Sequence, residues 1–114
     1  MKTPAKVENP EELEFHPRFE YGDQAKVAVV CGADDGTKLG AGYVRLENAE
    51  IPWTIRYDEV ILVLEGEITI RTDNGDLTAV SGETIWLPAD TALTYVAKSA
   101  LVFYAIQPSD WNAR

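Results

Sequence analysis

Turn-forming residues interrupt this chain at short, regular intervals from Ala25 onward, and this punctuation constrains the fold more than any other feature. The segments between the turns are rich in β-branched and aromatic residues, which is typical of strands separated by turns roughly every eight to twelve residues. Nine such segments can be delimited, at residues 26–30, 42–46, 51–55, 59–64, 67–71, 77–80, 84–87, 93–97 and 101–106. The spacing predicts an all-β chain and favours a sandwich or a small barrel over alternating strands and helices.

Two of these segments indicate how their strands are buried. Residues 67–71 alternate polar and apolar side chains, which is typical of a strand with one face in water and one in the core. Residues 60–64 are apolar without interruption, so we expect this strand at the centre of the barrel or in an oligomer interface. The sequence Asp-Asn-Gly-Asp at 73–76 predicts a two-residue hairpin turn with positive φ at Asn74 and Gly75.

The first 24 residues differ in composition from the rest of the chain. They hold three of the six prolines and the single histidine, His16, and their apolar residues are too sparse for a stable helix. Residues 10–15 could form one helical turn, but we predict an extended N-terminal arm over residues 1–24, lying over the body or over a partner subunit. Residues 25–114 are predicted to form a single domain, because a chain of 114 residues can bury one core.

The chain is acidic, with 10 Lys and Arg against 19 Asp and Glu and a formal net charge of -9. This argues against nucleic acid and anionic lipid as partners, since both attract basic surfaces. The longest apolar stretch is too short to span a membrane, and the first residues lack the apolar region of a signal peptide. Cys31 is the only cysteine, which suits a reducing compartment, so we expect a cytoplasmic protein.

Two blocks of the sequence resemble the conserved motifs of the cupin superfamily. In the first, Tyr-Asp-Glu-Val-Ile-Leu-Val-Leu-Glu-Gly-Glu at 57–67, six residues separate Glu59 from Gly66. The second is Gly-Glu-Thr-Ile-Trp-Leu-Pro at 82–88, which follows the predicted hairpin. The resemblance implies an RmlC-like double-stranded β-helix, or jelly-roll barrel, over residues 25–114.

The metal-binding histidines of cupins have no counterpart in these blocks. Trp53 and Ile55, in one alignment, and Leu93 stand where the histidines belong, and His16 lies in the arm. A transition-metal site of this type needs two or three imidazoles at facing strand positions. The sequence therefore excludes a histidine-based metal site within one chain and predicts neither a metal nor another cofactor, although carboxylates alone would suit Mg²⁺ or Ca²⁺.

Several short motifs narrow the resemblance to the EutQ family of ethanolamine utilisation. They are Gly-Ala-Gly-Tyr at 40–43, Pro-Trp-Thr at 52–54, Tyr-Asp-Glu at 57–59, Val-Leu-Glu-Gly-Glu at 63–67 and Gln-Pro-Ser-Asp-Trp at 107–111. The resemblance implies a metal-free homodimer that takes part in the catabolism of ethanolamine or another small amine. Longer family members are linked to acetate kinase activity and to microcompartments, but the few basic residues and the net charge of -9 disfavour a nucleotide site here.

The resemblance and the alternation of strand side chains together give the candidate site. The glutamate of the first cupin block points into the barrel, which places Glu59 there, and Trp53 and Tyr57 share its parity if no bulge intervenes. Tyr95 shares the parity of Leu93, the position of the missing histidine. We predict three catalytic residues, Glu59, Tyr57 and Tyr95. The predicted substrate-binding residues are Trp53, Thr54, Trp86 and Tyr104.

The environment of Glu59 decides what this site could do. Burial among aromatic rings would raise the pKa of Glu59 toward neutrality and suit a general acid or base, whereas a nearby Arg45 or Arg56 would lower it. An ionised Glu59 beside Trp53 would also attract a small amine through charge and cation–π contacts. The other interpretation is that residues 57–59 form a solvated entry to the strand.

Three functions follow for comparison. The first is a metal-independent site for a small molecule, an amine or a derived aldehyde or acid, with Glu59 as acid or base. The second is a non-enzymatic accessory or assembly protein of an amine-degradation pathway, and the third and weakest is a metal-dependent cupin enzyme. A homodimer is expected in each case, because a small barrel exposes edge strands. The sequence leaves open the substrate, catalysis itself, microcompartment association and a carboxylate-bound metal.

Overall fold

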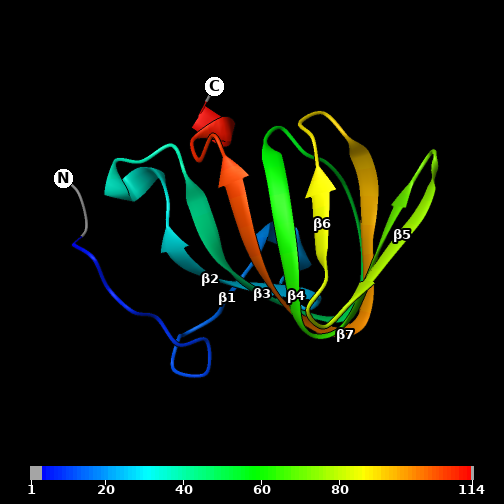
Figure 1. Ribbon diagram of the computed structural model, residues 1–114, viewed down its shortest axis with the longest axis horizontal. Helices are drawn as coiled ribbons and strands as arrows, with labels where there is room; N and C mark the ends of the chain where they lie inside the picture. Colours follow the sequence, from blue (N-terminus) through cyan, green and yellow to red (C-terminus); the bar gives the residue numbers. More distant parts are fainter. Residues whose placement is uncertain (1–3, 114) are drawn as a thin grey trace.

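The computed structural model describes residues 4–113, and these form one antiparallel sheet of seven strands with three short 3₁₀ turns. The strands are β1 (His16–Pro17), β2 (Ala25–Cys31), β3 (Gly40–Thr54), β4 (Asp58–Thr72), β5 (Gly75–Val80), β6 (Thr84–Leu87) and β7 (Ala92–Gln107). The 3₁₀ turns are η1 (Phe19–Tyr21), η2 (Ala33–Asp35) and η3 (Trp111–Ala113). The sheet order is β1-β2-β3-β7-β4-β5, with β6 paired to β4 (Figure 1). The all-β prediction is confirmed.

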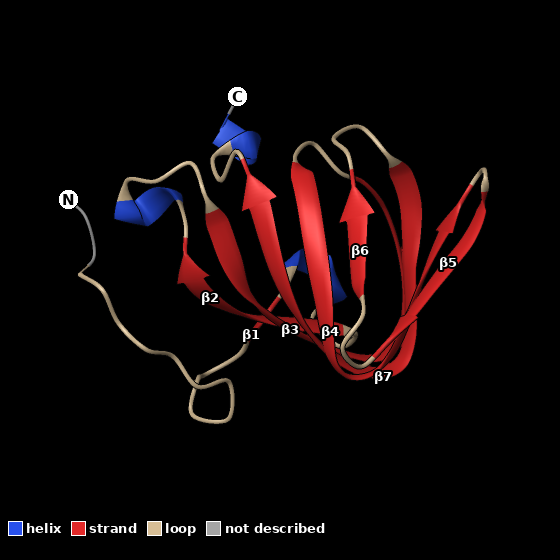
Figure 2. Ribbon diagram, viewed as in Figure 1, coloured by secondary structure: helices blue, strands red, loops and turns tan. Residues whose placement is uncertain are grey.

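Three of the strands are long and bent, which corrects the prediction of nine short strands. Each of β3, β4 and β7 joins two predicted segments into a single element of 15 or 16 residues. The bends lie beside one another, because Glu47 pairs with Ser99 and Gly66 pairs with Ala100. Figure 2 shows all three strands curving at the same end of the molecule, so that the sheet folds back over its own face.

The bends are possible because the backbone can turn there without leaving the ladder. Asn48 in β3 has φ 46°, and Gly66 in β4 has φ 80°. The pairing of β4 with β7 shifts register on both sides of Gly66, which marks β-bulges. A bulge adds a residue to one strand and bends it, and this allows a single sheet to form both walls of a barrel.

The hairpin between β4 and β5 differs in detail from its prediction. Thr72 pairs with Gly75, so the two loop residues are Asp73 and Asn74. Gly75 has positive φ, at 120°, whereas Asn74 does not belong to the positive-φ residues. The loop is therefore shifted by one position toward the N-terminus, and Gly75 begins the next strand.

Strand β4 shows how its two predicted burial patterns are realised. In residues 67–71, Ile68 and Ile70 are buried and alternate with more accessible neighbours, which confirms that prediction. In residues 60–64 the inward Ile61 and Val63 are buried. Val60 points outward and is 43% exposed, so the single chain does not cover both faces of this segment.

The N-terminal segment runs along the edge of the sheet before it reaches the mouth of the barrel. A hydrogen-bonded turn occurs at Asn9–Glu12 within otherwise irregular chain. β1 then pairs with β2, with His16 opposite Val27, and η1 follows directly. Of the predicted arm and domain, residues 1–3 and 114 lie outside the described range.

The core lies inside the folded sheet. Its largest fully buried side chains are Ile55, Ile68, Ile70, Leu87 and Val63. They come from strands and turns distant in sequence, and their removal from water stabilises the curved sheet. Among residues 4–113, no helix has the length and apolar character needed to cross a membrane.

Candidate functional site

A cavity of about 590 Å³ opens inside the barrel, next to the core. Inward-facing side chains of β3, β4 and β7 form its walls, and the N-terminal segment and η3 contribute to its mouth. Five of the seven predicted site residues line this cavity: Trp53, Tyr57, Glu59, Tyr95 and Tyr104. Arg18, which was not predicted, also lines it and matters for the chemistry.

Glu59 is a buried carboxyl group, with 7% of its surface exposed. The Tyr95 hydroxyl donates a hydrogen bond to its Oε1 over 2.9 Å, and this bond joins β4 to the first half of β7 across the barrel. Burial raises the pKa of Glu59 from 4.5 to about 7, because it penalises the charged form. The Tyr95 hydrogen bond and the positive charge of Arg18 oppose this rise in pKa only in part.

The two tyrosines beside Glu59 remain protonated at neutral pH. Burial, and after it the neighbouring Glu59 charge, raise the pKa of Tyr57 to about 12. The pKa of Tyr95 is raised well above its ordinary value for the same two reasons. Both phenols therefore act as hydrogen-bond donors or acceptors rather than as bases.

Aromatic rings form one wall of the cavity. The Trp111 ring meets the Trp53 ring edge to face at 6.3 Å between centroids, and it lies 5.2 Å from the Tyr57 ring. The indole Nε1 of Trp53 is buried and has no acceptor with ordinary hydrogen-bond geometry. This N–H interacts with the nearby Tyr57 hydroxyl, and the interaction slightly lowers the pKa of Tyr57. Trp111 was not predicted as a site residue, although it belongs to one of the family-like motifs.

Arg18 is the charged neighbour of Glu59, which corrects the expectation that Arg45 or Arg56 would fill this role. The arm brings the Arg18 guanidinium carbon within 4.8 Å of the Phe19 ring centroid and 5.6 Å of the Trp53 ring centroid. By contrast, Arg45 lies over Phe15 and Arg56 pairs with Asp90 at 3.1 Å, and neither lines the cavity. A basic residue between a proline and an aromatic residue was visible in the sequence, but nothing there showed that the arm folds over the barrel.

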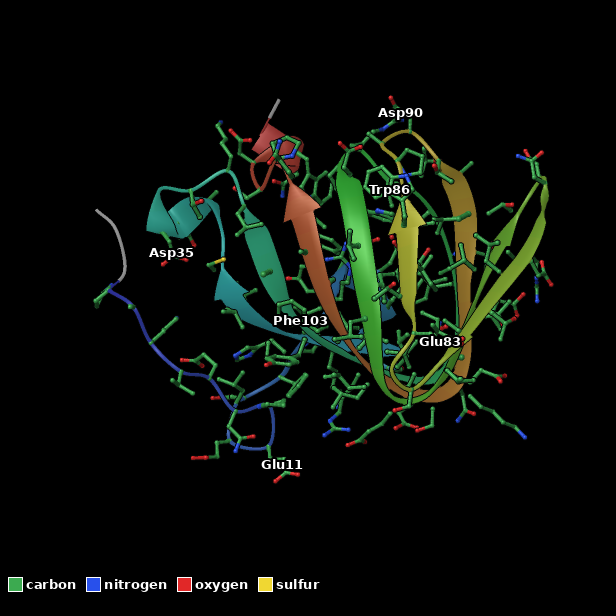
Figure 3. The ribbon with its side chains drawn as sticks, in the orientation of Figure 1. Glu11, Asp35, Glu83, Trp86, Asp90 and Phe103 are labelled. Atoms are coloured by element: carbon green, nitrogen blue, oxygen red, sulfur yellow. The ribbon has the colours of Figure 1, made fainter. Side chains whose placement is uncertain are left out.

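Two predicted substrate-binding residues, Trp86 and Thr54, do not line the cavity, so the structure does not bring them together with the other five. Trp86 is 58% exposed on β6, between the buried Ile85 and Leu87 (Figure 3). Thr54 is exposed at the end of β3, next to the buried Ile55. In both cases the alternation of strand side chains directs the residue outward. Tyr104 does line the cavity, and burial raises its pKa.

The cavity does not fit a transition metal of the cupin type. At the cupin ligand positions, Trp53, Ile55 and Leu93 offer no metal-binding atom, and Glu59 provides a single carboxyl group that is already bonded to Tyr95. Among residues 4–113, no cluster of three or more His, Cys, Asp or Glu side chains could hold an ion. The carboxyl group of Glu59 and the phenols around it are a poor donor set for zinc, iron or manganese.

Comparison with known sequences matches residues 6–113 to the family of ethanolamine utilisation protein EutQ. Acetate kinase EutQ of Escherichia coli K12 is 35% identical over 81 residues, which cover 70% of this chain and 35% of that protein. The protein of the same name from Clostridioides difficile is 30% identical over 82 residues, covering 71% and 52%. The chain thus matches between about a third and half of the length of these relatives.

Comparison with solved structures gives the same family and confirms the cupin prediction. The ethanolamine utilization protein Q of Salmonella typhimurium LT2 superposes with a TM-score of 0.85 at 25% identity, over 92% of this chain and 87% of that one. An RmlC-like cupin from Shewanella frigidimarina shares the fold over the full length of both chains, with a TM-score of 0.74 at 16% identity. The predicted resemblance is confirmed: this chain belongs to the EutQ family of ethanolamine utilisation proteins, built on the cupin fold.

Proposed function

We propose that this chain binds a small polar molecule of ethanolamine utilisation in the barrel cavity, without a metal ion, and that Glu59 exchanges a proton with it. The observation that supports this most directly is the Glu59–Tyr95 pair. A carboxyl group with a pKa near 7 borders a cavity of about 590 Å³ and is oriented by a phenol at 2.9 Å. Cavities of this size bind small molecules, and a few polar groups placed inside fix the orientation of the ligand.

Acid–base chemistry suits Glu59 better than attraction of a cation. With a pKa of about 7, Glu59 can both donate and accept a proton near the physiological range. The raised pKa lowers the average negative charge that would attract an amine, and the positive charge of Arg18 acts against the same attraction. Tyr95 keeps the carboxyl group in one orientation, which favours proton transfer at a defined position.

The relatives named acetate kinase do not extend that activity to this chain. The match covers only 35 to 52% of their length. A formal net charge of -9 repels nucleotide phosphates unless Mg²⁺ intervenes. The second candidate function is that of an accessory or assembly protein in the cytoplasm, and the exposed apolar side chains on the outer sheet face, Val60 and Trp86 among them, favour it.

The experiment that tests the proposed site compares ligand responses of the chain and of Glu59→Gln. Ethanolamine, other small amines, short aldehydes and short carboxylic acids are screened by melting temperature and tryptophan fluorescence. We expect at least one class to raise the melting temperature of the natural chain, because a ligand stabilises the state that binds it. The response should be lost in Glu59→Gln and should change with pH around 7.

The matched control is Glu67→Gln, which removes a carboxylate from the exposed part of the same strand. It should respond to ligands as the natural chain does. The proposal fails if no class changes either signal, or if Glu59→Gln and Glu67→Gln respond alike. Elemental analysis of the purified protein separates the metal-dependent alternative, which requires about one transition-metal ion per chain.

A further inference from the structure

The cavity already contains a cation where an amine ligand would bind. Aromatic faces bind ammonium groups at distances below about 6 Å, and Trp53 offers an indole face at this site. The guanidinium of Arg18 lies within that distance of Trp53 and of Phe19, whose rings stack at 5.9 Å. A free ammonium ion would have to displace Arg18 or accept its repulsion at close range.

The local backbone shows that the placement of Arg18 is specified by the fold. The Arg18 amide donates to the Ala25 carbonyl over 3.0 Å, which fixes the N-terminal arm at the edge of β2. Phe19 then takes the left-handed conformation, with φ 49°. A bulky residue rarely adopts this region, because the conformation costs free energy, and it persists only where the surrounding structure holds it. Here the reversal turns the Phe19 ring back onto Trp53 and keeps the guanidinium at the cavity.

One buried polar group in this part of the cavity, Trp53 Nε1, is a donor without an acceptor in ordinary hydrogen-bond geometry; its neighbour is the Tyr57 hydroxyl. A poorly paired buried donor costs free energy that a ligand oxygen would recover. The buried carboxyl group of Glu59 already accepts from Tyr95 at Oε1. Two further carboxylates line the cavity on η2, but Asp34 is exposed and Asp35 accepts from the Gly32 amide over 2.9 Å.

We infer that Arg18 is the specificity-determining residue of this cavity: together with Trp53 Nε1 it selects ligands that present an oxygen acceptor, neutral or anionic, and disfavours free ammonium cations. This inference rests on the proposed small-molecule site and names the chemical class of its ligand. The preference of the cavity then differs from that of the chain as a whole, because the net charge of -9 attracts cations at long range. A preference for an acceptor must therefore arise from contacts inside the cavity.

The test uses three probes of similar size and different charge: acetate, acetamide and ethylammonium. Binding is followed through the indole N–H resonances of the three tryptophans, assigned with Trp53→Phe and Trp111→Phe. We expect acetate and acetamide to shift the Trp53 resonance and ethylammonium to bind at least tenfold more weakly than acetate. In Arg18→Gln the affinity for acetate should fall about tenfold, since a charge-assisted hydrogen bond is lost, while ethylammonium should gain.

Arg45→Gln is the matched control, because Arg45 also lies over an arm aromatic residue but does not line the cavity. Arg18→Lys keeps the charge without the planar donor group, and circular dichroism confirms that each variant is folded. The inference is wrong if ethylammonium binds the natural chain as tightly as acetate, if no acceptor probe shifts the Trp53 resonance, or if Arg18→Gln behaves like Arg45→Gln. The proposed function survives any of these results whenever another ligand shows a Glu59-dependent response.

Discussion

A buried carboxyl group with a pKa near 7 destabilises the folded chain at any pH at which it is ionised. The pKa of Glu59 is raised from 4.5 to about 7 by burial, so between these values the folded state binds more protons than the unfolded state. Stability conferred by Glu59 is then fully present below about pH 4.5 and is lost as the pH rises through 7. The difference of about 2.5 between the two pKa values corresponds to a loss of about 3 kcal/mol in the free energy of unfolding.

Glu59→Gln should remove this dependence and keep an acceptor for Tyr95. We expect the variant to be more stable than the natural chain by up to about 3 kcal/mol at pH 8, and equally stable at pH 4. Urea unfolding at pH 4, 6 and 8 measures the difference. A stability difference that stays constant across this range would mean that Glu59 is not desolvated in the folded chain.

The site residues differ in how far the sequence could reveal them. The interior positions of Glu59, Tyr57 and Tyr95 followed from one family-like block and from strand alternation, which is a local property. Arg18 could not be found in this way, because its place depends on pairing between the arm and β2. Trp86 was assigned on aromatic character alone, although its buried neighbours Ile85 and Leu87 already implied the opposite direction.

At the level of strands, the bend of β4 depends on Gly66. This residue has φ 80°, and a Cβ there would overlap the Ser99 carbonyl oxygen of β7. Gly66→Ala therefore adds a backbone clash to the conformational cost, and we expect a loss of about 3 kcal/mol in the free energy of unfolding. The control is Gly82→Ala, with φ 89° and open space around the Cβ, which should cost only about 1 kcal/mol. Urea unfolding of both variants measures the losses, and equal losses would show that the contact with Ser99 does not limit the bend.

The same bends explain why nine predicted segments became three long and several short strands. Polar residues such as Glu47 and Ser99 interrupt the apolar pattern in the same way as a true turn does. What distinguishes a bend is continued pairing across it, as between Glu47 and Ser99, and that pairing joins positions far apart in the chain. The pattern of residues therefore predicted the strand-forming segments, and it could not show which of them would join.

At the scale of the whole molecule, the outer face of the sheet carries two cross-strand rows of apolar side chains. Register pairs Trp86 with Val60 and Val60 with Ala105 in one row, and Leu62 with Phe103 in the other. Trp86 and Val60 are 58% and 43% exposed in the single chain. The uninterrupted apolar sequence at 60–64 predicts either a central strand or an oligomer interface. β4 lies between β7 and β5 in the sheet, and the interface stays a prediction for the exposed Val60.

We propose that a second copy of this chain covers these rows in a two-fold symmetric dimer. Copies that each carry a net charge of -9 repel one another, so contact is favoured where the face is apolar. Trp86→Glu places a carboxylate in each copy at this face and should weaken the dimer at least tenfold, as measured by light scattering over a range of concentrations. Leu77→Glu is the control, because Leu77 is equally accessible, at 49% exposed, but lies on β5 outside the rows. A natural chain that stays monomeric at high concentration, or a dimer that Leu77→Glu disrupts instead, would show that the apolar rows do not form a dimer interface.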